Sequence, residues 1–162
     1  YDSEVNISCL GLWNKEIKLS ELEEVYSDGE FLDFENKYLK GAKSKKITTP
    51  SGSKGMASTS RRIPAQISPE LKASIENCAR NAFTALNCGG VARIDFLVNK
   101  QENKLVLVEV NTIPGSLAFY LWEAKGKPFT ELVNDLVDLA IVQYNEKTRH
   151  ARVFTSSVFK NL

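Results

Sequence analysis

Apolar and polar residues alternate most clearly around the polar stretch NKQENK, which separates two strand-like runs. These runs predict an antiparallel strand pair: Val91–Val98 and Leu105–Asn111. Because successive side chains of a strand point to opposite faces, Arg93 and Asp95 share one face. Glu109 and Asn111 share one face of the second run for the same reason. The pattern therefore predicts a strand pair that carries four polar side chains on one side.

A turn centred between the two runs determines which residues lie opposite each other. It places Asp95 opposite Glu109. The same register places Arg93 opposite Asn111. The other face carries apolar side chains and is expected to face the core: Ala92, Ile94, Phe96, Val106, Val108 and Val110.

The rest of the chain predicts two more extended segments and two helices. Glu4–Leu12 alternates as a strand, and residues 15–27 have an extended pattern. The first helix begins after Ser68, an N-cap residue followed by Pro69, and ends at Gly89–Gly90. Its apolar stripe is Leu71, Ile75, Ala79, Ala82, Phe83 and Leu86. The second helix spans residues 128–149, and its stripe is Phe129, Leu132, Val133, Leu136, Val137 and Ala140.

Residues 40–62 are rich in Gly, Ser, Thr, Lys and Arg and predict a long loop. A loop of this length inside a compact domain is usually functional or disordered. Its basic groups suit a lid over an anion, and a solvated loop is the alternative.

The 162 residues fit one domain. The composition, with 43% hydrophobic and 25% charged residues, is typical of a soluble globular protein. A net charge of +1 gives no strong field for nucleic acid or a membrane surface, and no apolar run is long enough to span a bilayer. Three scattered cysteines without a CxxC pair favour reduced thiols in a cytoplasmic protein, with a Cys78–Cys88 disulfide as the minority interpretation. The chain starts in strand-like sequence without an initiator Met, as a piece of a longer protein would.

The four polar residues of the strand pair suit a metal and phosphate site. Two carboxylates opposite each other repel unless a positive group lies between them, and Arg93 or a divalent cation can supply it. Oxygen atoms of Asp95, Glu109 and Asn111 suit Mg²⁺ rather than zinc or copper. Pro114–Gly115 follows directly, where backbone amides can face an anion. The combination favours this site over a solvated salt-bridge cluster.

The segments ARIDFLV and LVLVEVNTIPGS closely resemble the signature of D-alanine–D-alanine ligases, in the ATP-grasp superfamily: Arg-x-Asp, then Glu-x-Asn-Thr-x-Pro-Gly. Three further segments resemble parts of the family. FLDFENKY is similar to the family's FYDYEAKY, and RIPAQIS is similar to the segment that follows the family's mobile loop. GKPFTELVNDLVDLA is similar to the family's last long helix. The resemblance covers residues 4–140. It implies an α+β fold, with an antiparallel sheet and helices packed on one face, the C-terminal half of an ATP-grasp fold. Residues 1–146 would form this subdomain, with a mobile loop at about 40–62, and residues 147–162 a tail.

The resemblance also implies ATP-dependent carboxylate–amine ligation for peptidoglycan synthesis, in which an acyl phosphate of one D-alanine is attacked by the amine of a second. By motif position, two Mg²⁺ or Mn²⁺ ions would be bound by Asp95, Glu109 and Asn111. Arg93 and the Gly115 amide would stabilise the tetrahedral intermediate, with Tyr38 near the substrate. Three further positions match groups that contact the ribose, the adenine and the phosphates of ATP, respectively: Glu4, Phe31 and Lys37. Ordinary core aromatics and an exposed lysine are the alternatives for the residues between 31 and 38.

The chain departs from the family after Pro-Gly. The family usually continues MTSHS, and its last Ser helps to hold the carboxylate of the second substrate. Here SLAFYLWEA places Tyr120 at that position, with Ser116 beside the glycine as a further substrate contact. The sequence therefore leaves two alternatives for the second substrate: D-alanine, or another amino or hydroxy acid. A non-catalytic domain of this fold is a third interpretation, and the retained acids argue against it.

The family's N-terminal substrate domain and the first half of its ATP-grasp fold are absent from this sequence. We therefore expect that the chain alone binds ATP weakly and ligates nothing. Its expected partners are the rest of its own longer chain and small amino acids such as D-alanine. The family also suggests a homodimer.

Overall fold

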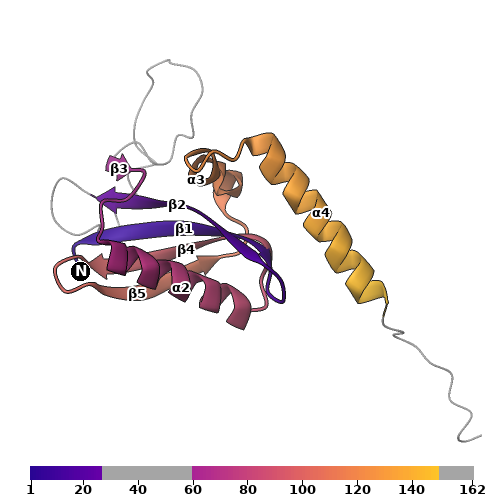
Figure 1. Ribbon diagram of the computed structural model, residues 1–162, viewed down its shortest axis with the longest axis horizontal. Helices are drawn as coiled ribbons and strands as arrows, with labels where there is room; N and C mark the ends of the chain where they lie inside the picture. Colours follow the sequence, from indigo (N-terminus) through magenta and orange to yellow (C-terminus); the bar gives the residue numbers. More distant parts are fainter. Residues whose placement is uncertain (27–59, 150–162) are drawn as a thin grey trace, which may run out of the picture.

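The computed structural model describes residues 1–26 and 60–149, which contain a five-stranded antiparallel sheet in the order β3-β2-β1-β4-β5 (Figure 1). The strands are β1 (Ser3–Leu12), β2 (Ile17–Tyr26), β3 (Ser60–Arg62), β4 (Gly89–Asn99) and β5 (Lys104–Asn111). The helices are α2 (Pro69–Ala85), η2 (Gly115–Ala118), α3 (Phe119–Glu123) and α4 (Phe129–Thr148). The predicted α+β class with an antiparallel sheet is confirmed. Of the predicted loop at 40–62, only β3 lies within the described residues.

Helix α2 covers one face of the sheet (Figure 1). It begins as predicted, because the Ser68 side chain accepts a hydrogen bond from the backbone N–H of Leu71 at 3.1 Å. Four α2 side chains are buried against the sheet: Leu71, Ile75, Ala79 and Phe83. They pack against apolar residues of β1 and β4, including Ile7 and Phe96, and form the main core.

The C-terminus of α2 lies one turn earlier than the sequence pattern predicts. Asn87 adopts a left-handed conformation with φ 52°. Its N–H donates to Thr84 O at 3.0 Å, and Cys88 N–H donates to Phe83 O at 3.0 Å. These bonds form a Schellman motif that ends the helix at an asparagine. Leu86 is therefore 59% exposed, so its assignment to the apolar stripe was wrong, and Gly89–Gly90 begin β4 instead of ending α2.

The opposite face of the sheet carries a second, smaller apolar cluster: Leu10, Val91, Trp122 and Leu132. Leu10 and Val91 come from the sheet, and the other two come from α3 and α4. The Trp122 indole N–H donates to Ser8 Oγ at 3.1 Å, which ties α3 to the central strand. The helices thus divide between two faces, a refinement of the single helical layer expected.

Helix α4 runs beside one end of the sheet, where it contacts β1 and β4, and the rest of its surface is exposed. Leu132 is fully buried and Leu136 packs against the second cluster. Phe129 and Val137 are 45% and 52% exposed, so the prediction that they face a core was wrong. Within the described ranges, no helix has the length and apolar character that crossing a membrane requires.

A β-bulge interrupts the predicted alternation of β5. Val108 has no partner on β4, and the register shifts by one residue there. Leu105 and Leu107 therefore pack against the main core, whereas Val106 and Val108 are 43% and 57% exposed. The expectation that Val106 and Val108 face the core was wrong. The other predicted core positions of the pair do contribute to it: Ala92, Ile94, Phe96 and Val110.

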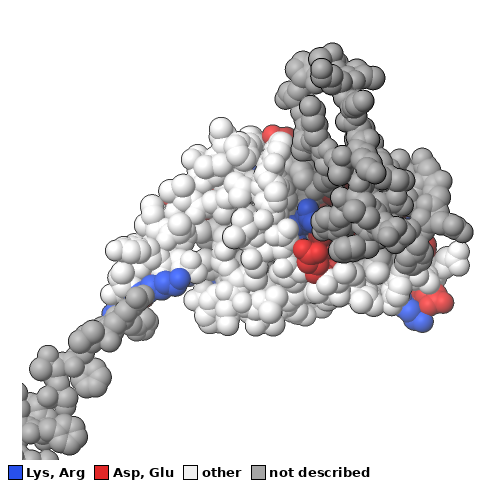
Figure 2. All heavy atoms as spheres, turned by 180° about the vertical axis from the view of Figure 1, so that it is seen from behind, with Lys and Arg blue, Asp and Glu red and all other residues white. Residues whose placement is uncertain are grey.

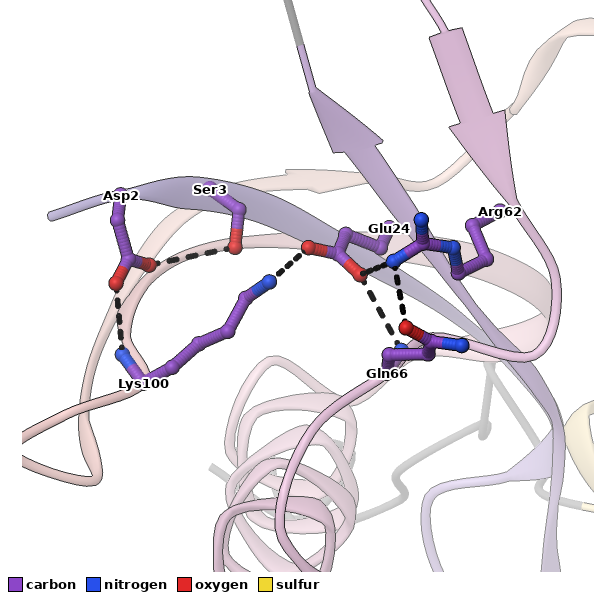
Figure 3. Close-up of polar contacts among 6 residues, drawn as sticks. All are labelled: Asp2, Ser3, Glu24, Arg62, Gln66 and Lys100. Carbon is purple, nitrogen blue, oxygen red and sulfur yellow. Dashed lines mark hydrogen bonds and ion pairs between the residues drawn. The ribbon is translucent and has the colours of Figure 1, made fainter.

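A buried carboxylate holds one end of the sheet together (Figure 3). Glu24 of β2 is 2% exposed and forms ion pairs with Lys100, after β4, and with Arg62 of β3 at 3.7 Å. It also accepts a hydrogen bond from the backbone N–H of Gln66 at 3.2 Å. Arg62 donates to Gln66 Oε1 at 2.9 Å. Both carboxylate oxygens are therefore satisfied, and Glu24 joins two strands, a turn and the segment before α2.

Candidate active site

A row of polar side chains crosses four strands on the face opposite α2. From β2 to β5 its members lie directly opposite one another: Glu23, Asn6, Asp95 and Glu109. Adjacent strands are about 4.8 Å apart, so neighbouring members can contact one ligand. Arg93 lies opposite Asn111 next to this row, and both predicted cross-strand pairings are confirmed. The view from behind shows few charged groups, with acidic and basic side chains adjoining near its centre (Figure 2).

Arg93 and Asp95 form a bidentate ion pair at the centre of the site. Arg93 Nε and Nη2 donate to the two oxygens of Asp95, both at 2.8 Å. Asp95 is 4% exposed, so the pair is largely shielded from water. The hydrogen bond to Asp95 raises the pKa of Arg93 above its usual range, although burial opposes the shift. Arg93 is thus a fixed, permanently charged group.

Three oxygen donors from β4 and β5 could hold a cation. Within the described residues, no three His, Cys, Asp or Glu side chains are grouped as a metal site. Glu109 is exposed, however, and lies directly opposite Asp95, with Asn111 two residues further along. Mg²⁺ commonly takes one or two protein carboxylates together with phosphate oxygens. The residues present therefore fit Mg²⁺, with Asp95 shared between a metal and Arg93.

A strained turn follows β5 and returns the chain to the sheet. Asn111 Oδ1 accepts the N–H of Ile113 at 3.1 Å, which starts the turn. Ser116, Leu117 and Ala118 then adopt left-handed conformations in succession, with φ of 52°, 57° and 51°. Such conformations cost about 1 kcal/mol or more each for non-glycine residues and cluster at functional sites. The turn places α3 beside β2, with Trp122 anchored on β1.

Tyr120 of α3 contacts the row at its β2 end. Its hydroxyl donates to Glu23 Oε2 at 2.9 Å, and Glu23 is 0% exposed. Arg61 of β3 forms an ion pair with Glu23 Oε1 at 3.4 Å and lies over the Tyr120 ring, with Cζ 5.8 Å from its centroid. Burial, followed by the charge of Glu23, raises the pKa of Tyr120 to about 12. Tyr120 is therefore a neutral hydrogen-bond donor at physiological pH.

The structure describes most of the residues that the sequence proposed for the site. Arg93, Asp95, Glu109 and Asn111 converge as expected, and Gly115, Ser116 and Tyr120 follow in the strained turn and α3. Glu4 lies in β1, opposite Leu97 and Val25. Three proposed residues lie outside the described ranges: Phe31, Lys37 and Tyr38.

Sequence reasoning missed three residues of this cluster: Asn6, Glu23 and Arg61. Asn6 interrupts the apolar alternation of β1, which was a usable signal. The sequence around Glu23 and Arg61 gave no such signal, because only strand pairing reveals that these two residues lie beside the site.

Comparison with known proteins agrees with this geometry. A family model described as "D-ala D-ala ligase C-terminus" matches residues 2–138. The D-alanine–D-alanine ligase of Thermosipho africanus is 35% identical over 141 residues, covering 87% of this chain and 35% of the relative. The D-alanine–D-alanine ligase of Chloroherpeton thalassium is 37% identical over 148 residues, which cover 89% of this chain and 36% of the relative. The chain therefore spans about a third of the length of these relatives.

Solved structures show the same fold. The D-alanine–D-alanine ligase from Bacillus anthracis complexed with ATP superposes with a TM-score of 0.63 at 20% identity, over 91% of this chain and 42% of that one. The VanG D-Ala:D-Ser ligase from Enterococcus faecalis superposes with a TM-score of 0.61 at 25% identity, over 86% of this chain and 36% of that one. The family model covers far more than half of the sequence, and the predicted motif lies in the matched region. The chain belongs to the D-alanine–D-alanine ligase C-terminus family.

Proposed function

We propose that this chain is the C-terminal part of a cytoplasmic ATP-grasp ligase that joins two D-alanines through an acyl phosphate, for peptidoglycan synthesis. One observation carries the proposal. Asp95 lies opposite Glu109, and Arg93 opposite Asn111, directly before the Pro-Gly turn. A family member that served only as a scaffold would have no use for two facing carboxylates, because their repulsion costs stability.

The described residues divide the chemistry among them. Arg93 binds the negative charge that develops on the tetrahedral intermediate, and the Gly115 amide is a second donor to the same oxygen. Asp95 orients Arg93 through the bidentate pair. Two Mg²⁺ ions, held by Asp95, Glu109 and Asn111, would neutralise the phosphates of ATP during transfer. Because Arg93 is already fixed, it needs little reorganisation when charge develops.

The remaining roles follow motif position. Glu4 would contact the ribose of ATP. The residues outside the described ranges would contact adenine, phosphate and substrate, respectively: Phe31, Lys37 and Tyr38. The upstream part of a longer chain would supply the other wall of the ATP site, and two such chains would form a homodimer.

The test is ATP-dependent dipeptide formation by a full-length protein that contains this chain, with D-alanine as substrate. Asn111→Ala should abolish turnover while the circular dichroism spectrum stays unchanged. Asn81→Ala, on the exposed surface of α2, is the matched control and should keep activity. Activity of Asn111→Ala equal to that of the control would remove the metal role. Dipeptide synthesis by residues 1–162 alone would contradict the proposed need for an upstream half.

A second candidate is a ligase of the same chemistry with a different amine or hydroxy acid as its second substrate. Tyr120 at the position of the family's serine favours it. A panel with D-alanine, D-serine and D-lactate at the second position separates the two candidates. An unaltered preference for D-alanine would count against the second.

A further inference from the structure

The turn that begins at Gly115 does not hold its shape by local preference. Gly115 itself has no positive φ, and a Cβ added to it would meet no atom within 4 Å in the described part of the chain. The next three residues all have a left-handed conformation that side chains disfavour: Ser116, Leu117 and Ala118. Such a conformation persists only where the surrounding structure fixes it. The contacts that fix this turn therefore also decide where the Gly115 amide points.

Helix α3 fixes the end of the turn through hydrogen bonds to two different strands. It starts directly after Ala118, which is 0% exposed. The Trp122 indole N–H donates to Ser8 Oγ on β1 at 3.1 Å. The Tyr120 hydroxyl donates to Glu23 Oε2 on β2 at 2.9 Å. The second bond has a carboxylate acceptor, and hydrogen bonds to charged groups are the stronger kind.

Glu23 and its neighbour Glu24 are both buried carboxylates, but they connect different parts of the molecule. Glu24 joins strands at one end of the sheet (Figure 3). Glu23 points to the opposite face, where it lies opposite Asn6 in the polar row of the candidate site. A buried carboxylate is costly unless partners stabilise it. Glu23 is paired with Arg61 at 3.4 Å and accepts the bond from Tyr120, so it links α3 directly to the polar row.

This link lies close to the guanidinium that acts on the reaction intermediate in the proposed ligase. Asp95 is the main cause of the raised pKa of Arg93, and two further groups add to it: Tyr120 and Glu23. The Tyr120 hydroxyl has one proton and donates it to Glu23, so it has none left for a substrate. The bond thus serves the placement of α3 and of the turn before it.

We propose that Glu23 and Tyr120 are positioning residues, whose hydrogen bond holds the turn so that the Gly115 amide faces the oxygen on which Arg93 also acts. This inference rests on the ligase function proposed above, in which that amide stabilises the tetrahedral intermediate. A donor stabilises the developing charge only at hydrogen-bond distance. A small shift of the turn therefore lowers the rate of the chemical step and leaves substrate binding unchanged.

The test is steady-state dipeptide formation by a full-length protein that contains this chain. Tyr120→Phe removes the hydroxyl and keeps the ring. We expect kcat to fall about tenfold or more, the factor of one hydrogen bond to a charged group. The KM values for ATP and for D-alanine at the second position should stay within about twofold. Tyr144→Phe is the matched control, because Tyr144 is 67% exposed on α4, and it should keep the wild-type kcat.

Glu23→Gln distinguishes a positioning bond from a general loss of packing. Glutamine keeps an acceptor for Tyr120 without the charge, so kcat should fall only about threefold. In the Tyr120→Phe background the same replacement should change kcat by less than about twofold, because the bond is already absent. Effects that multiply in the double variant would contradict the proposal. If Tyr120→Phe does not fold, Glu23→Gln decides alone, and a wild-type kcat would then overturn the role of the bond.

The remaining outcomes separate this inference from the function on which it rests. Equal kcat values for Tyr120→Phe and Tyr144→Phe would remove the positioning role and leave the ligase function intact. A raised KM for the second substrate with an unchanged kcat would also remove it, since the hydroxyl would then bind substrate. A wild-type protein that forms no dipeptide would instead refute the proposed function.

Discussion

The ion pair between Arg93 and Asp95 can be measured against an exposed pair of the same length. Arg93 is replaced by Met, which keeps the aliphatic stem and removes the charge. Asp95, with a side chain only 6% exposed, is then left without its two donors. Breaking a buried pair from one side costs about 3–5 kcal/mol. Because the Arg93 side chain is 20% exposed, water can enter, and we expect the lower end, about 3 kcal/mol.

Lys104→Met is the matched control. Lys104 and Glu102 lie 2.7 Å apart, but their side chains are 69% and 55% exposed. Such a pair contributes about 0.5 kcal/mol or less. The two pairs have nearly equal N···O distances but differ in burial and in the number of hydrogen bonds, so the comparison measures the combined effect of both.

The assay is urea unfolding of the 162-residue chain, followed by tryptophan fluorescence, to which the buried Trp122 and the exposed Trp13 both contribute. Asp95→Asn and the double variant complete a double-mutant cycle, and we expect a coupling energy of about 2–3 kcal/mol. Equal costs for Arg93→Met and Lys104→Met would refute the reasoning, since they would show that Asp95 is hydrated in the native protein.

Three further predictions follow from burial and charge. Phe83→Ala should lower the free energy of unfolding by about 3–5 kcal/mol, because Phe83 is fully buried. Leu86→Ala should lower it by less than about 1 kcal/mol, because Leu86 is 59% exposed. Similar losses for the two variants would contradict the assigned end of α2. The Tyr120 pKa of about 12 lies above its ordinary 10.0, so its stabilisation is complete below pH 10 and is lost as the pH rises toward 12. Stability should therefore fall less steeply over that range in Tyr120→Phe, as alkaline unfolding curves will show, and parallel curves would count against the bond to Glu23. The three cysteines are free thiols, and burial raises the pKa of Cys9 to about 12. A thiol reagent at neutral pH should thus modify the partly exposed Cys78 before Cys9, as peptide mass mapping will report, and the reverse order would be inconsistent with the packing of β1.

Patterns among residues close in sequence were sufficient to predict much of this fold. The alternation in β4 identified Arg93 and Asp95 as a polar pair on one face, and the predicted pairing with β5 holds at these two residues, beyond the bulge. Between the bulge and the turn the observed register differs by one residue from the predicted one. Ser68 and Pro69 marked the start of α2 correctly. These features depend on backbone geometry within a few residues, so the local pattern is enough to predict them.

The errors have equally local causes. Val106 and Val108 were assigned to the core because strict alternation leaves no place for a bulge, and one extra residue reverses the faces. Val137 was assigned to a core because periodicity identifies an apolar stripe and does not show whether an element lies against it.

The sequence by itself was enough to predict that Arg93, Asp95, Glu109 and Asn111 converge on one face, because all four lie within one hairpin. Only the tertiary structure decided that the polar row extends to Asn6 and Glu23, since their strand pairings join segments far apart along the chain. It also decided which group engages the Tyr120 hydroxyl. A tyrosine hydroxyl is free to donate to a substrate until the fold brings a buried carboxylate within 2.9 Å of it, and then its single proton is already committed.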